Sequence, residues 1–452
     1  MKIFTSAFLI ALLLISCKKE TETTPTGSAG YSQYGTPITS IPSTEDLVIY
    51  EVNLRAFSSA GNLAGVTARL QQIKALGVNT IWLMPIYSEG VLNSVNSPYC
   101  VKNYKEVSSE YGSLADLRTL TDQAHALNMT VILDWVANHT SWDNPWITAH
   151  DDWYTKNSAG QIIKPAGTNW NDVADLNFSN IAMQDAMIDA MKYWALEANV
   201  DGFRCDYADG VPFTFWNKAI AALKSLPNRH LQFLAEGTRL DHYSAGFDMT
   251  YSWNFYTAIK NCWTGASAMT LFSTNTNEYA AIPSGKHKIR FTTNHDESAW
   301  TASPITQYNG VNGALAASIP TIFMYGVPLI YSGQEVGRAS TTPFFTKSPI
   351  NWNANPTMLQ SYKDVMAVYT SSEAARKGSI SNYSSTDVIC FKKTKNTDQL
   401  LVFTNARNTA TIYTIPAALE GSQWINALTN ESITLSTELN LTAYQFLLLK
   451  NQ

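Results

Sequence analysis

Three acidic residues stand at the ends of three separate apolar runs in the sequence. Asp206 closes the run GFRCD, Glu236 closes LQFLAE, and Asp296 lies in IRFTTNHDE. Each run has the length of a buried strand, and parallel strands that are buried on both faces read as nearly continuous apolar segments. In a β/α barrel the functional carboxylates lie at the C-terminal ends of such strands. Three acids that meet on one rim would supply the nucleophile, the proton donor and the charge stabiliser that cleavage of a glycosidic bond requires.

The strand that ends at Asp206 places a guanidinium next to the first acid. Successive side chains of a strand point to opposite faces, so Arg204 and Asp206 project the same way and Cys205 points toward the helix layer. A nearby guanidinium favours the charged carboxylate, which suits Asp206 to the role of nucleophile. A purely structural ion pair is the alternative. A proton donor needs the opposite shift, and we expect the charges of Asp206 and Asp296 to raise the pKa of Glu236.

Two histidines lie close in sequence to acidic strand ends. His295 directly precedes Asp296, and His139 follows Asn138 after the run that ends at Asp134. Clusters of Asp and His can hold a metal, but the chain has no HxH or HExxH pattern and no further ligand at a suitable spacing. We therefore predict no catalytic metal and expect both histidines to bind sugar hydroxyls.

The elements that would carry these residues alternate between strands and helices from about residue 47. Repeated units of this length imply a parallel sheet, either a closed barrel or a doubly wound sheet. Eight strands can be placed, which favours a closed (β/α)8 TIM barrel. The predicted strands are 47–53, 78–84, 130–134, 202–206, 231–236, 247–250, 287–293 and 328–331. Apolar positions spaced by three or four residues predict helices over 63–76, 114–127 and 183–194.

Two parts of the chain interrupt or follow this alternation. Residues 139–180 carry turn formers and no convincing periodicity, and a loop of this length is usually functional or a small subdomain. Its tryptophans favour platforms for sugar stacking, and they are Trp142, Trp146, Trp153 and Trp170. Short β-type runs predict an all-β sandwich domain over 378–452, which leaves 44–372 for the barrel.

The first 43 residues have the pattern of a targeting segment followed by a linker. Lys2 precedes an apolar run over 3–15 that suits a secretory signal and is too short for a permanent membrane span. The segment LISC at 14–17 resembles a bacterial lipobox. It predicts a signal peptide over 1–16, lipidation at Cys17 and export to the periplasmic side or the cell surface on a lipid anchor. An ordinary signal cut elsewhere is the alternative. Residues 17–43 are rich in Thr, Ser, Gly and Pro and predict a flexible tether.

The composition describes an ordered globular protein and argues against one class of partner. Hydrophobic residues make up 45% of the 452 residues, enough for a large barrel with an accessory domain. The net charge of −5 and the lack of a Lys/Arg cluster argue against nucleic acid. The cysteines beyond Cys17 are scattered, which favours buried free thiols over a disulfide. They are Cys100, Cys205, Cys262 and Cys390.

Four short segments in a fixed order give the chain a specific resemblance. They are DWVANH at 134–139, GFRCD at 202–206, LAE at 234–236 and TNHD at 293–296. This set resembles the four ordered regions of the α-amylase family of glycoside hydrolases, family 13, and VADLN at 173–177 resembles a fifth. The resemblance covers roughly residues 46–370, with 139–180 as the family's domain B and the β-rich tail as its C-terminal domain.

The resemblance implies a retaining mechanism on an α-glucan. Asp206 would attack the anomeric carbon, Glu236 would protonate the leaving oxygen and later activate water, and Asp296 would stabilise the oxocarbenium-like sugar. Cleavage of α-1,4 bonds in starch or maltooligosaccharides is the simplest activity that it implies. The residues that would bind the sugar are Tyr99, which would stack beneath it, and His139, Arg204 and His295.

Departures from the family pattern leave the ion and the specificity open. Many calcium-dependent members use the Asn of the first region, an Asp of the fifth, and a His four residues after the nucleophile. Asn138 and Asp175 match, but the last position is Gly210. We expect no required cofactor, with a structural calcium ion as the alternative. An α-1,6-acting, cyclodextrin- or neopullulan-hydrolysing or transglycosylating enzyme, or a non-catalytic glycan binder, are the alternative functions. The sequence does not distinguish endo from exo action, and it does not predict the oligomeric state.

Overall fold

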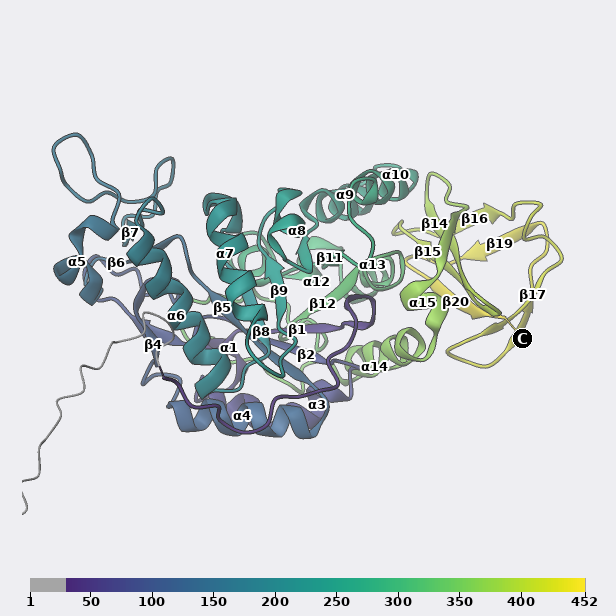
Figure 1. Ribbon diagram of the computed structural model, residues 1–452. Coiled ribbons are helices and arrows are strands. Elements are labelled where there is room, and N and C mark those ends of the chain that lie inside the picture. Colours follow the sequence, from purple (N-terminus) through teal and green to yellow (C-terminus); the bar gives the residue numbers. More distant parts are fainter. Residues whose placement is uncertain (1–29, 452) are drawn as a thin grey trace, which may run out of the picture.

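The computed structural model describes residues 30–451, and its centre is a closed barrel of eight parallel strands (Figure 1). The strands follow one another around the barrel in chain order, and β1 closes it by pairing with β12. Each overlaps a predicted strand, so the (β/α)8 barrel is confirmed. The strands are β1 (Ile49–Val52), β2 (Thr80–Leu83), β5 (Thr130–Trp135), β8 (Gly202–Cys205), β9 (Gln232–Ala235), β10 (Met249–Tyr251), β11 (His287–Arg290) and β12 (Val327–Tyr331).

Alternating side chains of the strands fill two separate apolar layers. Inward positions such as Ile49, Ile132 and Leu234 form a buried cluster inside the barrel. Cys205 belongs to the larger cluster between the strands and the surrounding helices, as its place in the alternation predicts. Gly202 opens β8 with φ +152°, and an added Cβ would lie 2.0 Å from the Gln232 carbonyl oxygen. A side chain at this position would therefore push β8 and β9 apart.

Helices surround the barrel, and one predicted helix is divided in two. Residues 63–76 form α2 (Leu63–Thr67) and α3 (Leu70–Lys74), because Arg69 leaves the helical region with φ −114° and ψ 8°. The apolar face persists across the break, since Leu63, Leu70 and the residues of that face between and after them are buried. The remaining longer helices are α4 (Leu114–Ala126), α6 (Ile181–Glu197), α7 (Phe213–Lys224), α9 (Trp253–Trp263), α10 (Met269–Tyr279), α13 (Val311–Phe323) and α14 (Pro356–Ser371). Shorter helices are α1 (Leu54–Phe57), α5 (Pro145–Ala149), α8 (Asp241–Ala245), α11 (His295–Trp300), α12 (Pro304–Gln307) and α15 (Glu373–Lys377), with 3-10 turns η1 (Thr44–Asp46), η2 (Asp151–Trp153) and η3 (Ala208–Gly210).

The insertion after β5 is a small lobe beside the barrel (Figure 1). Its strands β6 (His139–Ser141) and β7 (Val173–Asp175) pair antiparallel, and a hairpin of β3 (Tyr87–Glu89) and β4 (Val101–Val107) lies nearby. The expectation that its tryptophans stack on sugar is wrong for Trp146 and Trp153. These two rings lie 5.1 Å apart at 77° and belong to the large apolar cluster, which continues from the helix layer of the barrel into the lobe. Trp142 also packs against the main core, which leaves Trp170 to line a pocket.

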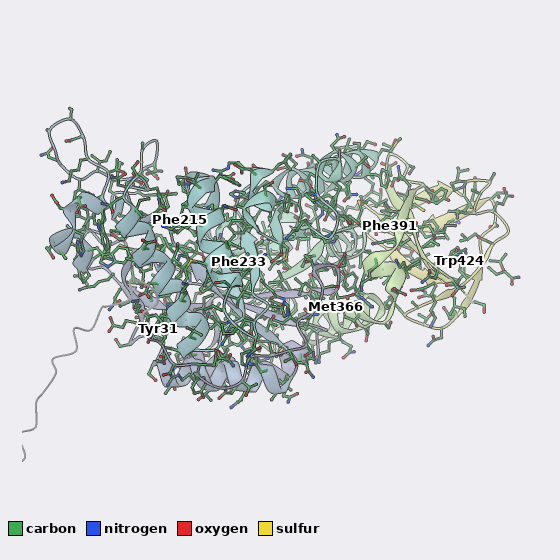
Figure 2. All side chains as sticks on the ribbon, viewed as in Figure 1. Tyr31, Phe215, Phe233, Met366, Phe391 and Trp424 are labelled. Atoms are coloured by element: carbon green, nitrogen blue, oxygen red, sulfur yellow. The ribbon has the colours of Figure 1, made fainter. Side chains whose placement is uncertain are left out.

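The C-terminal region is all-β, as predicted, and its two sheets enclose a separate apolar core that includes Phe403. Trp424 belongs to the same core (Figure 2). The six-stranded sheet has the order β13-β14-β15-β20-β17-β18, and β16 pairs with β19. Short β-type runs at 387–392, 400–404, 410–414 and 444–449 predict four of these strands. The other four, β13, β17, β18 and β19, have no clear sequence signal because most of their side chains are exposed or half-buried. The strands are β13 (Ser379–Asn382), β14 (Val388–Lys395), β15 (Asp398–Asn405), β16 (Thr411–Thr414), β17 (Gln423–Asn426), β18 (Ser432–Thr434), β19 (Glu438–Leu441) and β20 (Phe446–Lys450).

The segment before the barrel differs from the predicted free tether over residues 30–43. The Tyr31 hydroxyl donates to Asp189 at 2.6 Å, and the Tyr34 hydroxyl donates to Asp122 at 2.7 Å. These contacts hold the segment against α4 and α6. The predicted signal peptide, the lipidation site at Cys17 and the rest of the tether lie outside the described residues. Within 30–451 the apolar stretches of the helices are too short or too polar to cross a bilayer. The thiols of Cys100, Cys205, Cys262 and Cys390 are free and buried, as predicted.

Candidate active site

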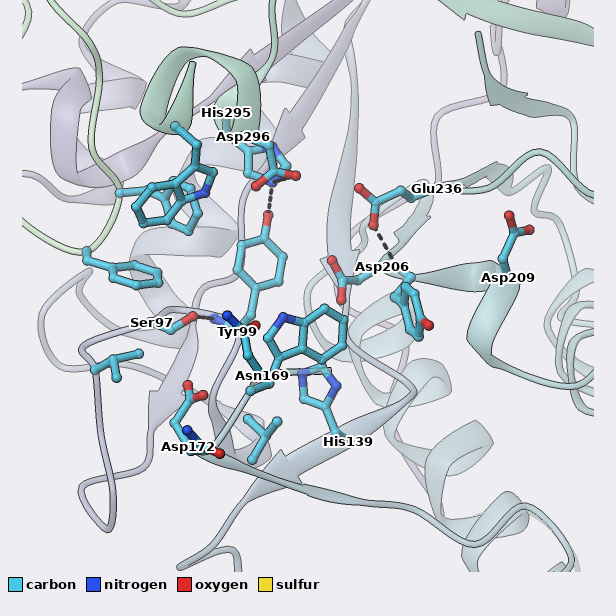
Figure 3. Close-up of a pocket in the computed structure, with 18 of the residues that line it drawn as sticks. Ser97, Tyr99, His139, Asn169, Asp172, Asp206, Asp209, Glu236, His295 and Asp296 are labelled. Atoms are coloured by element: carbon cyan, nitrogen blue, oxygen red, sulfur yellow. Dashed lines mark hydrogen bonds and ion pairs between the residues drawn. The ribbon is translucent and has the colours of Figure 1, made fainter. Parts of the chain in front are cut away.

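A pocket of about 770 Å³ opens at the carboxyl ends of the barrel strands. Asp206 directly follows β8, Glu236 directly follows β9, and Asp296 lies in the first turn of α11 after β11. All three predicted acids line this pocket (Figure 3). It is also lined by three of the predicted sugar-binding residues, Tyr99, His139 and His295.

Arg204, the fourth predicted sugar-binding residue, is completely buried and joins three carboxyl groups. Its Nη1 donates to Asp134 Oδ1 and to Asp206 Oδ1, both at 2.8 Å. Its Nη2 lies 2.8 Å from Glu236 Oε1. Its Nε donates to the hydroxyl of Tyr251 at 3.2 Å. One guanidinium therefore fixes Asp206 and Glu236 as neighbours, and it takes no part in the lining of the pocket.

The electrostatics of the two central acids differ in part from the prediction. Burial raises the pKa of Asp206 to about 6, since Arg204 lowers it but the charge of Asp134 opposes this. Burial is also the largest cause that raises the pKa of Glu236 to about 7, and Asp206 and Asp296 add to it as predicted. Arg204 alone therefore does not set the charge of Asp206. The order of the two pKa values still favours an ionised Asp206 beside a protonated Glu236.

Tyr99 is held by a hydrogen-bonded chain that contains two further buried acids. Its hydroxyl donates to Asp134 Oδ2 at 3.1 Å and lies 2.8 Å from His295 Nε2. His295 Nδ1 lies 2.5 Å from Glu51 Oε1. Burial lowers the pKa of His295, but Asp296 and Glu51 outweigh it and raise the pKa to about 9. The imidazolium thus donates from both nitrogens, and its ring stacks on Tyr99 with the centroids 5.5 Å apart.

His139 is neutral, whereas His295 is protonated. Burial lowers the pKa of His139 to about 4, so the ring is neutral near pH 7. Its ring centroid lies 5.4 Å from that of Trp170 on the insertion. Its backbone carbonyl accepts a hydrogen bond of 2.8 Å from Tyr104, whose own ring is buried. Tyr104 therefore supports the floor of the insertion, and Tyr99 is the tyrosine that reaches the pocket.

The predicted calcium ligands have few partners for such an ion. Calcium takes six to eight oxygen ligands, several of them carboxylates in most sites. Asn138 and Asp175 lie on paired parts of the insertion, since Leu176 N donates to the Asn138 carbonyl and His139 pairs with Asp175. Gly210 adds no side chain. Across residues 30–451 no group of three or more His, Cys, Asp or Glu is arranged to hold a metal. Of the predicted ligands, Asp175 alone offers a carboxylate, and Asn138 offers an amide oxygen.

Several residues of the site were not singled out from sequence. Glu51 lies in β1 and Asp134 lies in β5. Asp134 ends the apolar run TVILD, so the pattern that predicts the three catalytic acids could also have identified it. Tyr207 follows Asp206, and its backbone N–H donates to Glu236 Oε2 at 2.8 Å. Asp209 accepts from the backbone N–H groups of Thr238 and Arg239 and so ties the loop after β8 to the loop after β9.

Aromatic side chains extend the pocket on the side of Asp296. Trp300, the last residue of α11, is 65% exposed. Its ring lies 5.7 Å from Phe344 and 5.4 Å from Phe345, and all three line the pocket. Phe344 also contacts Tyr99 edge-on at 5.9 Å. The pocket therefore continues past the central acids as an open, apolar surface.

The chain matches a family model and proteins whose names describe α-glucan enzymes. Residues 43–247 match the model of the alpha amylase catalytic domain. Alpha-amylase MalA of Haloarcula japonica is 26% identical over 431 residues, which cover 90% of this chain and 62% of that relative's length. A probable oligo-1,6-glucosidase of Bacillus subtilis is 32% identical over 197 residues, which cover 36% of this chain and 34% of that protein.

The fold matches solved structures over nearly their whole length. An alpha-amylase from Lactobacillus plantarum superposes with a TM-score of 0.81 and 28% identity, and the match covers 90% of this chain and 99% of that one. A maltogenic alpha-amylase from Thermotoga neapolitana has the same TM-score of 0.81 at 24% identity, with 90% and 99% covered. The barrel, the insertion and the C-terminal sheets thus occur together in other chains.

Proposed function

Because the chain belongs to the α-amylase family of glycoside hydrolases, family 13, we propose that it hydrolyses α-1,4-glucosidic bonds in starch and maltooligosaccharides and retains the anomeric configuration. The observation that carries this proposal is the pairing of Asp206 and Glu236 with the single guanidinium of Arg204, in a pocket that Asp296 also lines. Retaining glycosidases keep the nucleophile and the proton donor close together, whereas inverting enzymes separate them to admit water.

In the first step Asp206 attacks the anomeric carbon while Glu236 gives its proton to the leaving oxygen. With a pKa of about 6, Asp206 is mostly ionised at neutral pH, and with a pKa of about 7, Glu236 retains its proton in a large fraction of molecules. The bond to the leaving sugar breaks and a glycosyl ester forms on Asp206. Asp296 faces the same pocket and stabilises the positive charge that develops on the sugar ring.

The second step uses the same residues with Glu236 as the base. Esterification removes the charge of Asp206, which is one of the causes that raise the pKa of Glu236. Its pKa therefore falls after the first step, and Glu236 can take a proton from the attacking water. The ester bond breaks, the sugar leaves with its original configuration, and Asp206 is again free.

The sugar that is cleaved lies against Tyr99 and His139. Tyr99 offers a fixed ring, since its hydroxyl is bonded on both sides. His139 is neutral and lines the pocket, so it can bind a sugar hydroxyl. The nitrogens of His295 are bonded to Glu51 and Tyr99, so this residue orients Tyr99, and because it also lines the pocket it lies within reach of the same sugar.

Product analysis tests this function. The protein is offered maltotetraose, starch, pullulan and isomaltooligosaccharides, with Asp206→Asn and the surface variant Ile412→Ala in parallel. Ile412 is 65% exposed on β16, far along the chain from the pocket residues. We expect α-configured maltose from the α-1,4 substrates with the native protein and the control, and none with Asp206→Asn. Cleavage of the α-1,6 substrates alone would show that the enzyme is specific for α-1,6 bonds. No turnover of any substrate would refute the enzymatic assignment.

We further propose that the chain is exported and anchored through lipid on Cys17 and that its activity needs no calcium ion. The sequence LISC at 14–17 supports the anchor. Labelling with radioactive palmitate in a bacterial host tests it, because Cys17→Ser should abolish the label and the membrane association. Glycine in place of a histidine at position 210, and the lack of a group of three or more His, Cys, Asp or Glu residues within 30–451, support the second part. Labelling that persists in Cys17→Ser would refute the anchor.

A further inference from the structure

Tyr207 adopts a backbone conformation that its residue type disfavours. Ten residues other than glycine have positive φ between residues 30 and 451, and eight of these are asparagines, which tolerate the left-handed region. Tyr207 is one of the two tyrosines among them, with φ 41° and ψ 45°. Such strain persists where the surrounding structure requires it, often at functional sites. The conformation aims the Tyr207 N–H at Glu236 Oε2, and the next residue, Ala208, donates to the Glu236 carbonyl at 2.9 Å.

The ring of Tyr207 faces the pocket and meets the insertion. It is 37% exposed and lies edge-on to Trp170, with the centroids 5.1 Å apart and the planes at 81°. Both rings line the pocket. Trp170 comes from the insertion and Tyr207 from the barrel, so the pair forms one continuous aromatic surface across the two parts of the chain.

Gly210 makes this position of the ring possible. A Cβ at Gly210 would lie 2.2 Å from Cε1 and 2.4 Å from Cδ1 of Tyr207. A side chain at 210 and the ring of Tyr207 therefore compete for the same space. Many calcium-dependent members of the family have a histidine at this position. Here the residue is Gly210, and the Tyr207 ring occupies the space that a side chain would take.

The ring lies on the leaving-group side of the central acids. The proton donor must stand beside the leaving oxygen, so the leaving sugar lies near Glu236 and away from Tyr99. Figure 3 shows Glu236 and Asp209 on one side of Asp206, and Tyr99 and Asp296 on the other. The Tyr207 N–H donates to Glu236, and the ring of Tyr207 packs against Gly210, which follows Asp209 on the same side.

We propose that Tyr207 and Trp170 form the wall that binds the leaving-group glucosyl unit and that Gly210 is a specificity-determining position because it makes room for this wall. The apolar C–H faces of a glucose ring pack on aromatic rings, which bury much apolar area at little entropic cost. This inference rests on the proposed function. In the second step the same wall would hold an acceptor sugar, which competes with water for the glycosyl ester.

The test compares two substrates that share a donor and differ in the leaving group. Maltotetraose, scored for cleavage into two maltoses, places maltosyl on the donor side and maltose on the leaving side. α-Maltosyl fluoride places the same maltosyl unit there, and fluoride leaves in place of a sugar. The variants are Tyr207→Asn, which suits the left-handed backbone, and Trp170→Ala. A third variant, Gly210→Ala, should displace the Tyr207 ring without removing it. The matched control is Trp300→Ala, an exposed aromatic on the donor side.

We expect the ratio of kcat/KM for maltotetraose to that for the fluoride to fall about tenfold in each of the three variants. The share of transfer products at high maltose should fall with it. Trp300→Ala should leave the ratio unchanged, because both substrates present the same donor. Melting temperatures show that each variant is folded. A ratio that stays constant in Tyr207→Asn and Trp170→Ala, with the native protein active on both substrates, would overturn the inference. A native protein that cleaves neither substrate would overturn the proposed function itself.

Discussion

Replacement of Asp134 by asparagine should move the acid limb of the pH profile to lower pH. Asp134 and Asp206 accept hydrogen bonds of 2.8 Å from the same nitrogen of Arg204, which keeps their bonded oxygens within about 5.6 Å of each other. The charge of Asp134 is one of the causes that raise the pKa of Asp206 to about 6. Asp134→Asn removes this charge and leaves Arg204 to Asp206 and Glu236, so the pKa of Asp206 should fall.

The size of the shift follows from this separation. Two unit charges about 5.6 Å apart interact with about 3 kcal/mol at an effective dielectric constant of about 20, which corresponds to about two pH units. Burial raises the pKa of Asp134 itself to about 6, so it carries about half of its charge where Asp206 titrates. The expected displacement of the acid limb is therefore about one pH unit.

The assay is kcat/KM for maltotetraose between about pH 4 and about pH 9. In the native protein we expect a bell-shaped profile that rises with ionisation of Asp206 near pH 6 and falls with deprotonation of Glu236 near pH 7. The matched control is Glu335→Gln, which removes another buried acid with a raised pKa of about 7, bonded to Tyr50 outside the pocket lining. An acid limb in Asp134→Asn that stays in place, or that moves upward, would show that Asp134 does not act through the charge of Asp206.

Three further outcomes are expected. Asp209→Ala should lower the free energy of unfolding by about 2 kcal/mol, because the N–H groups of Thr238 and Arg239 lose their acceptor, and a denaturant titration measures this. The pKa of Asp209 is lowered to about 2, because its bonds to His242 and to these N–H groups outweigh the effect of burial. The stability that Asp209 contributes is therefore present above about pH 4 and is lost as the pH falls toward 2. A variant whose melting temperature depends on acid pH as that of the native protein does would contradict this. Gly202→Ala should cost more than about 3 kcal/mol or prevent soluble expression, because its Cβ would meet the next strand, and native-like melting would show that the strands can separate. Chelation with EDTA should leave the rate on starch unchanged, and a loss that added calcium restores would refute the calcium-free proposal.

The part of the fold that sequence predicted depends on burial on both faces. The eight barrel strands read as apolar runs because both of their faces are covered, and the acids stood out as polar residues at the ends of such runs. The strands of β17 to β19 gave no such signal, since most of their side chains are exposed or half-buried. The break at Arg69 was also hidden, because the apolar spacing continues across it.

The sequence predicted which residues form the site better than it predicted their pKa values and conformations. Asp206, Glu236 and Asp296 could be placed from strand ends, but the net pKa of Asp206 depends on Asp134, which arrives from another strand. Whether an indole lies in a pocket or in a core depends on tertiary packing, as Trp170 and the buried Trp153 show. No sequence pattern predicts a left-handed tyrosine, because the strain at Tyr207 is imposed by contacts that form only in the fold.

The junction between the barrel and the C-terminal sheets has a consequence for how the molecule comes apart. Arg407 donates to the carbonyl of Cys262 in the last turn of α9 at 2.7 Å and to the carbonyl of Ala266 in the loop after α9 at 2.8 Å, and its Nε donates to Asp387. The rings of Trp263 and Tyr444 stack across the same junction. Separation of the two parts would break these hydrogen bonds and expose both rings. The C-terminal sheets therefore stabilise the barrel through this interface, and we expect heating to unfold the barrel and the sheets together in a single cooperative transition.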